Sequence, residues 1–414
     1  MAAPCGQGRR YLRIQRGLLD DSLQPPLPRN VPDFAGRAPT QPMTDDVLIA
    51  GGGLAGACAA FALSRAGHAV RLLEATGEPA SGASGAAAGS VNPLMGRRAR
   101  PTWRLGEALG ALRWIVRAAG AEATFDERGV LRPAQNAEQA GVFQDAAGEH
   151  PDRTAWLSAE AASDRFPAVQ SPHGALWIDD GGAADVPALV GALLDAARER
   201  GATVETGARV TGWTERAEHV TVEVEREVER GGERTRRREA ERLLLCVGLG
   251  YAALGALAPL DLRAVKGQTL RLRRPPALDG ARLPGSLSGS GYVVSQPGGT
   301  LLAGSTYEHE ARHLRPTDDG RQYILDKVSR MLPPLAEAEV IGAQAGARVS
   351  PPGSPLPALG PLPCGGTDRS DRRVWFFGAL GSRGLLTAPL LARALPTLLA
   401  KPARIPDAVR ARAS

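Results

Sequence analysis

The stretch Asp46-Val-Leu-Ile-Ala-Gly-Gly-Gly-Leu-Ala-Gly56 decides the fold of this chain. Its apolar run 47–50 predicts a short buried strand, and the glycine cluster predicts a tight turn. A helical pattern follows over 54–66, Gly67 marks another turn, and a second apolar run covers 69–74. Strand, glycine turn, helix and second strand make one βαβ unit, so the sequence predicts an α/β fold.

Within this unit, Gly51, Gly53 and Gly56 form the pattern G-x-G-x-x-G, and Glu74 ends the second strand. In a Rossmann-type unit the first glycine permits the turn, the second lets a pyrophosphate approach the backbone, and the third lets helix and strand pack. The helix N-terminus offers free N–H groups to phosphate, and the acid accepts hydrogen bonds from ribose hydroxyls. We therefore expect a dinucleotide to be bound by Gly51, Gly52, Gly53, Leu54, Ala55, Gly56 and Glu74.

The composition is that of a globular enzyme with more than one lobe. The chain has 414 residues, 43% of them hydrophobic and 23% charged, which is too long for one small core. No apolar run is long enough to span a bilayer, so we expect no membrane span. The net charge of +6 suits a polyanion such as tRNA, although arginine replaces lysine nearly everywhere, which is also a compositional habit.

The four cysteines, Cys5, Cys58, Cys246 and Cys364, are scattered and form no C-x-x-C pair. Neither a metal site nor a disulfide is expected from them, and a reducing cytoplasm fits this pattern. Cys58 and Cys246 lie in apolar segments, so we expect both to be small core residues.

The remaining pattern predicts a second lobe inserted into the first. Segment 1–42 is rich in proline and lacks apolar periodicity, so we expect it to be disordered. Val220 begins a strand whose turn falls at Gly231-Gly232, and the charge run between Glu225 and Arg242 reads as the solvated face of that hairpin. Other predicted elements are a helix over 103–119, strands at 203–205, 243–247, 269–272, 292–295, 301–304 and 374–377, and a last helix over 387–399.

From Asp46 to Leu399 the chain resembles the D-amino-acid-oxidase-like family of FAD oxidoreductases. Four blocks carry the resemblance: the glycine turn with Glu74, the small-residue block 82–89, the apolar strand that ends at Gly248, and Gly381-Ser-Arg-Gly384. The resemblance implies FAD as cofactor. It adds these cofactor-binding candidates: Ser84, Gly85, Val210, Gly248, Gly381, Ser382, Arg383, Gly384 and Leu385.

The resemblance also implies how the chain divides. Residues 43–400 form the oxidoreductase domain, and 401–414 form a tail. The Rossmann-like FAD lobe covers about 43–115, 185–255 and 340–400. The inserted substrate lobe, an α+β unit with a mainly antiparallel sheet, covers about 116–184 and 256–339.

Within the family, Gly82-Ala-Ser-Gly85 and the segment from Gly381 to Pro389 are most similar to the oxidoreductase half of the bifunctional enzyme that modifies the tRNA wobble uridine. That half removes a carboxymethyl group from 5-carboxymethylaminomethyl-uridine. This chain departs from it twice: the methyltransferase half has no counterpart, and the Arg-Asp-x-Leu-Pro motif expected after Arg348 reads Gly353-Ser-Pro-Leu-Pro357.

The resemblance implies hydride removal by FAD from the carbon next to an amine, which gives an imine that hydrolyses. Arg348 is the candidate for gripping a substrate carboxylate, because its planar guanidinium makes two parallel bonds; the alternative is a surface ion pair. Tyr292 caps the same pocket or is an ordinary strand aromatic. Lys266 assists electron acceptance by the flavin or has no such role. The last helix aims the N–H groups of Gly384 and Leu385 at the flavin's pyrimidine edge.

Several functions stay open at this stage. The first is an amine oxidoreductase with tRNA as partner, and its runner-up is a glycine or D-amino-acid oxidase or dehydrogenase acting on a free amino acid. A non-catalytic FAD- or RNA-binding protein is the alternative from another class. Oxidation of a 2-hydroxy acid ranks last, because the histidines stand in no motif that would make one of them the base.

Overall fold

The computed structural model describes residues 45–228, 232–311, 313–363 and 372–413. Thr44–Ser414 form one compact unit with two large sheets. Segment 1–42, expected to be disordered, lies outside the described residues, as does Gly231 of the predicted hairpin turn. None of the described helices is long and apolar enough to cross a bilayer.

The first sheet contains the predicted βαβ unit. Five strands run parallel in the order β11 (Thr203–Glu205), β2 (Val70–Leu73), β1 (Asp45–Ala50), β14 (Gly232–Leu245) and β21 (Val374–Gly378). β20 (Ala358–Pro361) pairs antiparallel with β21, while β13 (Val220–Val228) and β12 (Ala208–Glu215) extend antiparallel from the first half of β14. The chain returns to this sheet at its C-terminal end, as the sequence predicts.

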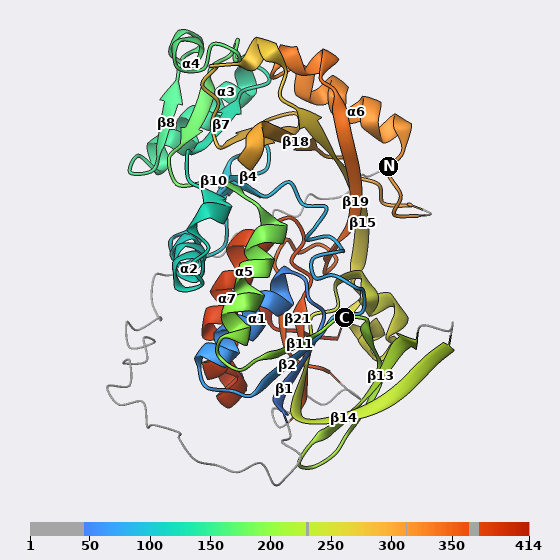
Figure 1. Ribbon diagram of the computed structural model, residues 1–414. Helices are drawn as coiled ribbons and strands as arrows, with labels where there is room; N and C mark the ends of the chain where they lie inside the picture. The colour runs from blue at the N-terminus through green and yellow to red at the C-terminus, as the bar shows by residue number, and fades with distance from the viewer. Residues whose placement is uncertain (1–44, 229–231, 312, 364–371, 414) are drawn as a thin grey trace, which may run out of the picture. The chain divides into compact units, whose positions relative to one another are not determined.

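Helices cover one face of this sheet (Figure 1): α1 (Leu54–Arg65), α2 (Leu105–Ala118), α5 (Val186–Arg198) and α7 (Gly384–Ala400). α1 is made mostly of small apolar residues and is buried except at Arg65, so α5 and α7 both pack against it. α5 begins where the Asp185 carboxylate accepts a hydrogen bond from the Ala188 N–H at 3.1 Å.

The opposite face of the sheet packs against short 3₁₀ helices, η3 (Gly248–Ala253) and η4 (Gly255–Leu260), the second of which contains Pro259. The stretch Gly248-Leu-Gly250-Tyr-Ala-Ala253 is similar to the glycine pattern after β1, but it leads into no α-helix. A proline in this position removes a helical hydrogen bond and prevents a second βαβ unit.

The second sheet is mainly antiparallel. Its order is β19 (Val340–Ser350), β15 (Arg263–Arg273), β18 (Thr300–Gly304), β17 (Tyr292–Ser295), β16 (Ser286–Ser288), β7 (Val130–Pro133), β9 (Ala175–Ile178) and β8 (Thr154–Leu157). Only β16 and β7 pair parallel among these neighbours. The mainly antiparallel second sheet is therefore present, as the sequence analysis expects.

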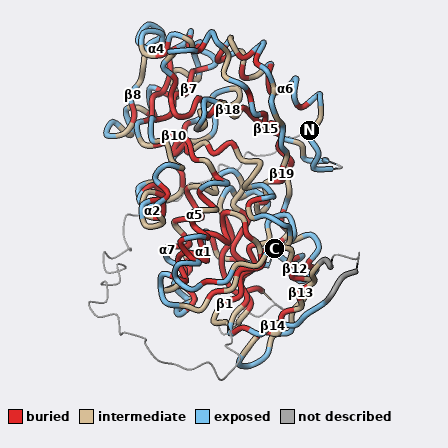
Figure 2. The backbone as a smooth tube through the Cα atoms, viewed as in Figure 1, coloured by how far each residue is buried: buried red, intermediate tan, exposed pale blue. Residues whose placement is uncertain are grey.

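Helices pack on both faces of the second sheet. α3 (Ala137–Glu149) packs on alternate residues of β7 and β9, while α4 (Ala159–Arg165), α6 (Asp318–Ser329) and η7 (Pro333–Glu337) pack on the other face. Figure 2 shows buried residues gathered around β1 and α1, and again around β7 and β18. Each sheet therefore has its own core.

Short strands complete the fold. β3 (Ser90–Val91), β10 (Gly182–Ala184) and β6 (Phe125–Asp126) form one small sheet, and β4 (Leu94–Met95) pairs with β5 (Arg100–Pro101). The remaining 3₁₀ helices are η2 (Glu122–Thr124), η5 (Pro276–Leu278), η6 (Pro297–Gly299), η8 (Pro402–Arg404) and η9 (Asp407–Val409).

The structure differs from the sequence-based division in three places. β19 pairs along its length with β15, so Val340–Ser350 lie in the second sheet and not in the FAD lobe. α7 begins at Gly384, before the predicted start at 387. The C-terminal residues 401–413 are no loose tail: Val409 is buried, and the Ala411 N–H donates to the Leu359 carbonyl at 3.0 Å.

Candidate functional site

One cavity of about 960 Å³ is lined by residues from both sheets. Ligand pockets are roughly 300–1,000 Å³, so this cavity lies at the upper end of the range. It has room for a dinucleotide together with a small substrate group.

The glycine turn between β1 and α1 forms part of the wall. Gly51 has φ +107°, and a Cβ added there would lie 2.4 Å from the Cys246 carbonyl oxygen. A Cβ on Gly56 would lie 1.9 Å from the Gly51 carbonyl oxygen. Gly51, Gly53, Leu54 and Ala55 line the cavity, whereas Gly56 serves the packing of α1 on the turn.

Glu74 lies at the end of β2 and lines the same cavity. Its carboxylate accepts from the Gly52 N–H at 2.6 Å and from the Thr76 N–H at 2.9 Å. The Thr76 hydroxyl also donates to it, at 2.8 Å. A carboxylate has about four acceptor sites, so it has capacity for one further hydrogen bond, such as one from a ribose hydroxyl. Gly52 does not line the cavity; its N–H holds Glu74 in place.

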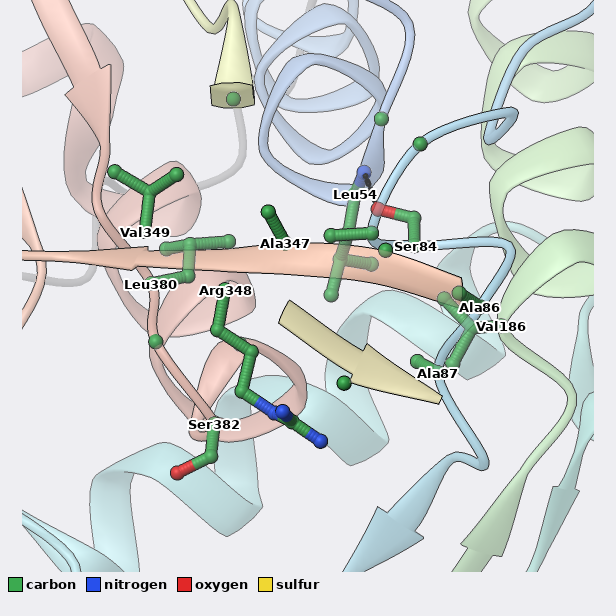
Figure 3. A pocket seen from close by; sticks show the side chains of 18 of the residues that line it. Leu54, Ser84, Ala86, Ala87, Val186, Ala347, Arg348, Val349, Leu380 and Ser382 are labelled. Atoms are coloured by element: carbon green, nitrogen blue, oxygen red, sulfur yellow. Dashed lines mark hydrogen bonds between the residues drawn. The ribbon is translucent and has the colours of Figure 1, made fainter. Parts of the chain in front are cut away.

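The small-residue block approaches the start of α1. The Ser84 hydroxyl accepts from the Leu54 N–H at 3.0 Å (Figure 3). Gly53 at the helix start has no side chain to cap the first turn, whose N–H groups lack acceptors within the helix. Ser84 and 86–89 line the cavity, but Gly85 does not: a Cβ there would meet the Ala80 carbonyl oxygen at 2.2 Å.

The start of α7 borders the cavity through Gly381, Ser382, Arg383, Gly384 and Leu385. The Gly381 N–H donates to the Val349 carbonyl at 2.9 Å, which ties this turn to β19. No side chain caps the first turn of α7, so the positive end of its dipole faces the cavity. Burial lowers the pKa of the Arg383 guanidinium.

Val210 and Gly248 line the cavity together with Glu74. Val210 lies on β12 and is buried, and Gly248, which has φ +50°, begins η3 shortly after the end of β14. The structure thus brings together thirteen of the sixteen predicted cofactor-binding residues in the wall of one cavity; the exceptions are Gly52, Gly56 and Gly85.

Arg348 extends from β19 into the cavity, on the opposite side of the strand from Ala347 and Val349 (Figure 3). Its Nη2 donates to the Ser305 hydroxyl at 2.7 Å, and the guanidinium lies 4.5 Å from the centre of the Tyr307 ring. A Cβ on Gly267 would lie 2.2 Å from Nη1, so a side chain there would displace the guanidinium from this position. Within the described chain no carboxylate pairs with Arg348, unlike the surface ion pair considered above.

Tyr292 lines the cavity beside Arg348. A Cβ on Gly304 would lie 2.6 Å from the Tyr292 hydroxyl, so the phenol packs over that glycine. Burial raises the pKa of Tyr292 above its ordinary value, while the charge of Arg348 opposes the shift. The phenol therefore stays protonated near neutral pH and is a hydrogen-bond donor, not a base.

Lys266 lies outside the cavity wall. Side chains alternate along a strand, so Gly267 faces the cavity and Lys266 does not. Its buried ammonium pairs with Glu308 at 3.0 Å. Burial by itself would raise the pKa of Glu308, but hydrogen bonds from Lys266 and Thr306 outweigh it, and the pKa is lowered. The structure places Lys266 in a tie between β15 and the segment after β18.

Sequence reasoning missed the residues that complete this end of the cavity. Ser305, Tyr307, Arg132 and Lys327 all line it, on or beside strands and helices of the second sheet. Arg132 and Lys327 stand alone in their segments, and Ser305 and Tyr307 share one short segment, so no recognisable motif marks any of them. Other missed lining residues stand next to predicted ones: Gly267 directly follows Lys266, and Ala347 and Val349 flank Arg348.

The fold and the cavity define a class before any comparison: a dinucleotide-binding α/β protein whose second sheet presents an arginine and a tyrosine to the same cavity. The chain belongs to the FAD-dependent oxidoreductase family DAO, whose model matches residues 46–396. FAD is the cofactor of this family, and the residues present fit it: the glycine turn, the Glu74 carboxylate and the starts of α1 and α7 all border one cavity.

Two relatives and one solved structure show what this chain is similar to. The chain is 28% identical to the bifunctional protein ThiO/ThiG of Synechocystis, covering 86% of this chain and 52% of that protein. It is 31% identical to the tRNA 5-methylaminomethyl-2-thiouridine biosynthesis bifunctional protein of Burkholderia cenocepacia, covering 90% and 58%. The chain thus spans little more than half of each relative. Glycine oxidase from Geobacillus kaustophilus shares the fold, with a TM-score of 0.73 at 23% identity, covering 86% of this chain and 95% of that one.

Proposed function

We propose that this chain oxidises the C–N bond of an amine that carries a carboxylate, and that the preferred substrate is the carboxymethylaminomethyl side chain of a tRNA wobble uridine. Arg348 carries the proposal: it is a half-buried guanidinium aimed into the cofactor cavity with no carboxylate partner among the described residues. Desolvated cations of this kind bind carboxylates by charge-assisted hydrogen bonds.

The dinucleotide part of FAD would be held by the glycine turn and the acid after β2, namely Gly51, Gly53, Leu54, Ala55 and Glu74. The start of α7 would approach the flavin. When bound, FAD supplies the hydride acceptor for oxidation of the carbon next to nitrogen. The uncapped N–H groups of Gly384 and Leu385, with the dipole of α7, stabilise negative charge on a group placed there.

The protein's remaining task is to orient the substrate. Ser305 and Tyr307 hold the Arg348 guanidinium from its edge and its face, and Tyr292 adds a neutral donor beside it. A carboxylate on Arg348 and Tyr292 therefore fixes one end of the substrate. The positive charge of Arg348 and the loss of water favour the neutral form of the nearby amine, which is the form that can be oxidised.

A free amino acid such as glycine is the second candidate. The observation in its favour is the same pair, because Arg348 and Tyr292 would grip the carboxylate of a free amino acid equally well. The two candidates differ in what lies beyond the amine: a nucleoside needs an open mouth, and glycine needs none.

Anaerobic mixing of the FAD-loaded protein with substrate tests the proposal. One arm contains tRNA with 5-carboxymethylaminomethyl-uridine, and the others contain glycine or sarcosine. Bleaching of the visible flavin band by the tRNA alone supports the wobble-uridine substrate, and bleaching by the small amines alone assigns the chain to the amino-acid oxidases. If no amine bleaches the band, amine oxidation is wrong and a binding role for FAD or RNA replaces it.

A further inference from the structure

The cavity opens beside a basic hairpin. β4 and β5 pair antiparallel, with Leu94 opposite Pro101 and Met95 opposite Arg100. This hairpin carries Arg97, Arg98 and Arg100, which we call the hairpin arginines. All three are exposed, and Arg97 also lines the cavity.

Side chains from outside the hairpin hold its backbone by hydrogen bonds, whereas the described residues offer no carboxylate to its arginines. The buried Arg132 donates to the carbonyls of Leu94 and, at 2.6 Å, Gly96, and its guanidinium lies 4.7 Å from the centre of the Phe143 ring. Gln139 donates to the Arg97 carbonyl at 3.2 Å. In the described part of the chain, none of the hairpin arginines has a carboxylate partner. Their positive charge is therefore available to a ligand.

Two exposed aromatic rings belong to the part of the chain around the second sheet, and one of them, Tyr307, lines the cavity. Tyr307 is 58% exposed and Tyr323 is 49% exposed, although both are large rings. Each stands beside a cation, Arg348 for Tyr307 and Lys327 for Tyr323, and Tyr307 and Lys327 both line the cavity. Exposed arginines beside a cavity that also carries an exposed ring suit unpaired RNA, which is bound through phosphate contacts and base stacking.

We propose that the hairpin arginines bind phosphates of the RNA that carries the amine, and that Tyr307 stacks on a base next to the reactive side chain. This inference rests on the proposed function and adds to it the surface that receives the macromolecule. A free amino acid would leave this surface unused, because Arg348 and Tyr292 already account for its carboxylate.

The test is direct binding of a fluorescently labelled anticodon stem-loop RNA, followed by anisotropy. The variant is Arg97→Gln/Arg98→Gln/Arg100→Gln. Each phosphate contact on a single strand contributes about 0.7 to the slope of log K against log salt concentration, so losing three contacts weakens binding about 100-fold at about 0.1 M salt and lowers the slope by about 2. Retained flavin absorbance shows that the variant is folded.

The matched control is Arg216→Gln/Arg236→Gln/Arg237→Gln. These three arginines are exposed, lie outside the cavity wall, and change the net charge equally. Binding by the control should equal that of the wild type. Equal weakening in both variants, or unchanged binding in the hairpin variant, overturns the inference.

Tyr307→Leu separates stacking from charge. It should weaken RNA binding several-fold without changing the salt slope, because base stacking on an aromatic side chain involves no counterion. A wild-type protein that oxidises sarcosine but binds no RNA overturns this inference and leaves amine oxidation standing. Failure of every amine to reduce the flavin overturns the proposed function, while the anisotropy result still decides the docking surface.

Discussion

The single residue that most defines the site is Arg348. Its guanidinium has a hydroxyl at its edge, an aromatic ring on its face and a glycine against its Nη1, but no carboxylate among the described neighbours. The charge is thus positioned by neutral groups and stays available to an anionic substrate group.

Arg348→Met should remove the selection for a carboxylate. Losing a desolvated charge pair costs about 2–4 kcal/mol in the transition state, so kcat/KM for the carboxylate-bearing amine that reduces the flavin should fall roughly 30- to 1,000-fold. Oxidation of dimethylamine, which lacks the carboxylate, should change little. Steady-state kinetics with both amines measures the ratio. A parallel loss for both amines would mean that Arg348 does not contact the carboxylate.

At the scale of elements, α1 depends on close contact with the turn that precedes it. Gly56 has no room for a methyl group, because the Gly51 carbonyl oxygen would lie 1.9 Å away. By contrast, Gly110 in α2 is exposed and has open space around its Cβ position. The two glycines therefore respond oppositely to the same substitution.

Gly56→Ala should lower the free energy of unfolding by about 1–3 kcal/mol through overpacking, and it should reduce the FAD content. Gly110→Ala should raise the free energy of unfolding by about 0.5–1 kcal/mol, because alanine is the better helix former. Urea unfolding and the flavin absorbance of the purified proteins check both. A Gly56→Ala protein as stable and as yellow as the wild type would contradict the assigned role of Gly56.

The Lys266–Glu308 pair ties β15 to the segment that carries Ser305 and Tyr307. The folded-state pKa of Glu308 is below its ordinary value, so the pair stabilises the fold above that ordinary value and loses its effect as pH falls through the lowered pKa. The Glu308 side chain is 35% exposed, so solvent screens the effect.

Glu308→Gln should therefore be less stable than the wild type at neutral pH, and the difference should shrink as the pH drops below about 4.5, near the ordinary glutamate value. Urea unfolding at saturating FAD over a descending pH series measures the difference. A gap that stays constant down to acid pH would show that the carboxylate charge contributes nothing.

At the scale of the whole molecule, both sheets contribute walls to the cavity, so its occupant links two separate cores. A ligand that binds only the folded state stabilises it by mass action. The cofactor should therefore stabilise the entire unit from Thr44 onwards and not one lobe alone.

Removing FAD should lower the Tm, and adding it back should restore stability by about 2.7 kcal/mol at a free concentration 100 times Kd. FMN should stabilise less, because it lacks the adenosine part that we assign to Glu74 and Val210 in the cavity wall. Thermal unfolding of the apoprotein during titration with each flavin measures this. Equal shifts for FMN and FAD would contradict the position assigned to the adenosine.

Local sequence was enough to predict β1, α1, the glycine turn and Glu74, because steric demands and hydrogen bonds in this unit act within about two dozen residues. The same holds for the turn at Gly381 before α7. The sequence pattern even placed β17 and β18 correctly, since each is a short apolar run.

Tertiary structure alone decided how the substrate end is assembled. Four residues from separate elements meet there: Gly267 from β15, Tyr292 from β17, Ser305 from the segment directly after β18, and Arg348 from β19. These elements lie far apart in sequence. The register of β19 against β15 decides the side on which Arg348 emerges, and a slip of one residue would turn it to the side of Ala347 and Val349, away from Ser305 and Tyr307. The same alternation turns Lys266 away, because which of two adjacent residues faces a cavity depends on strand pairing and not on residue type.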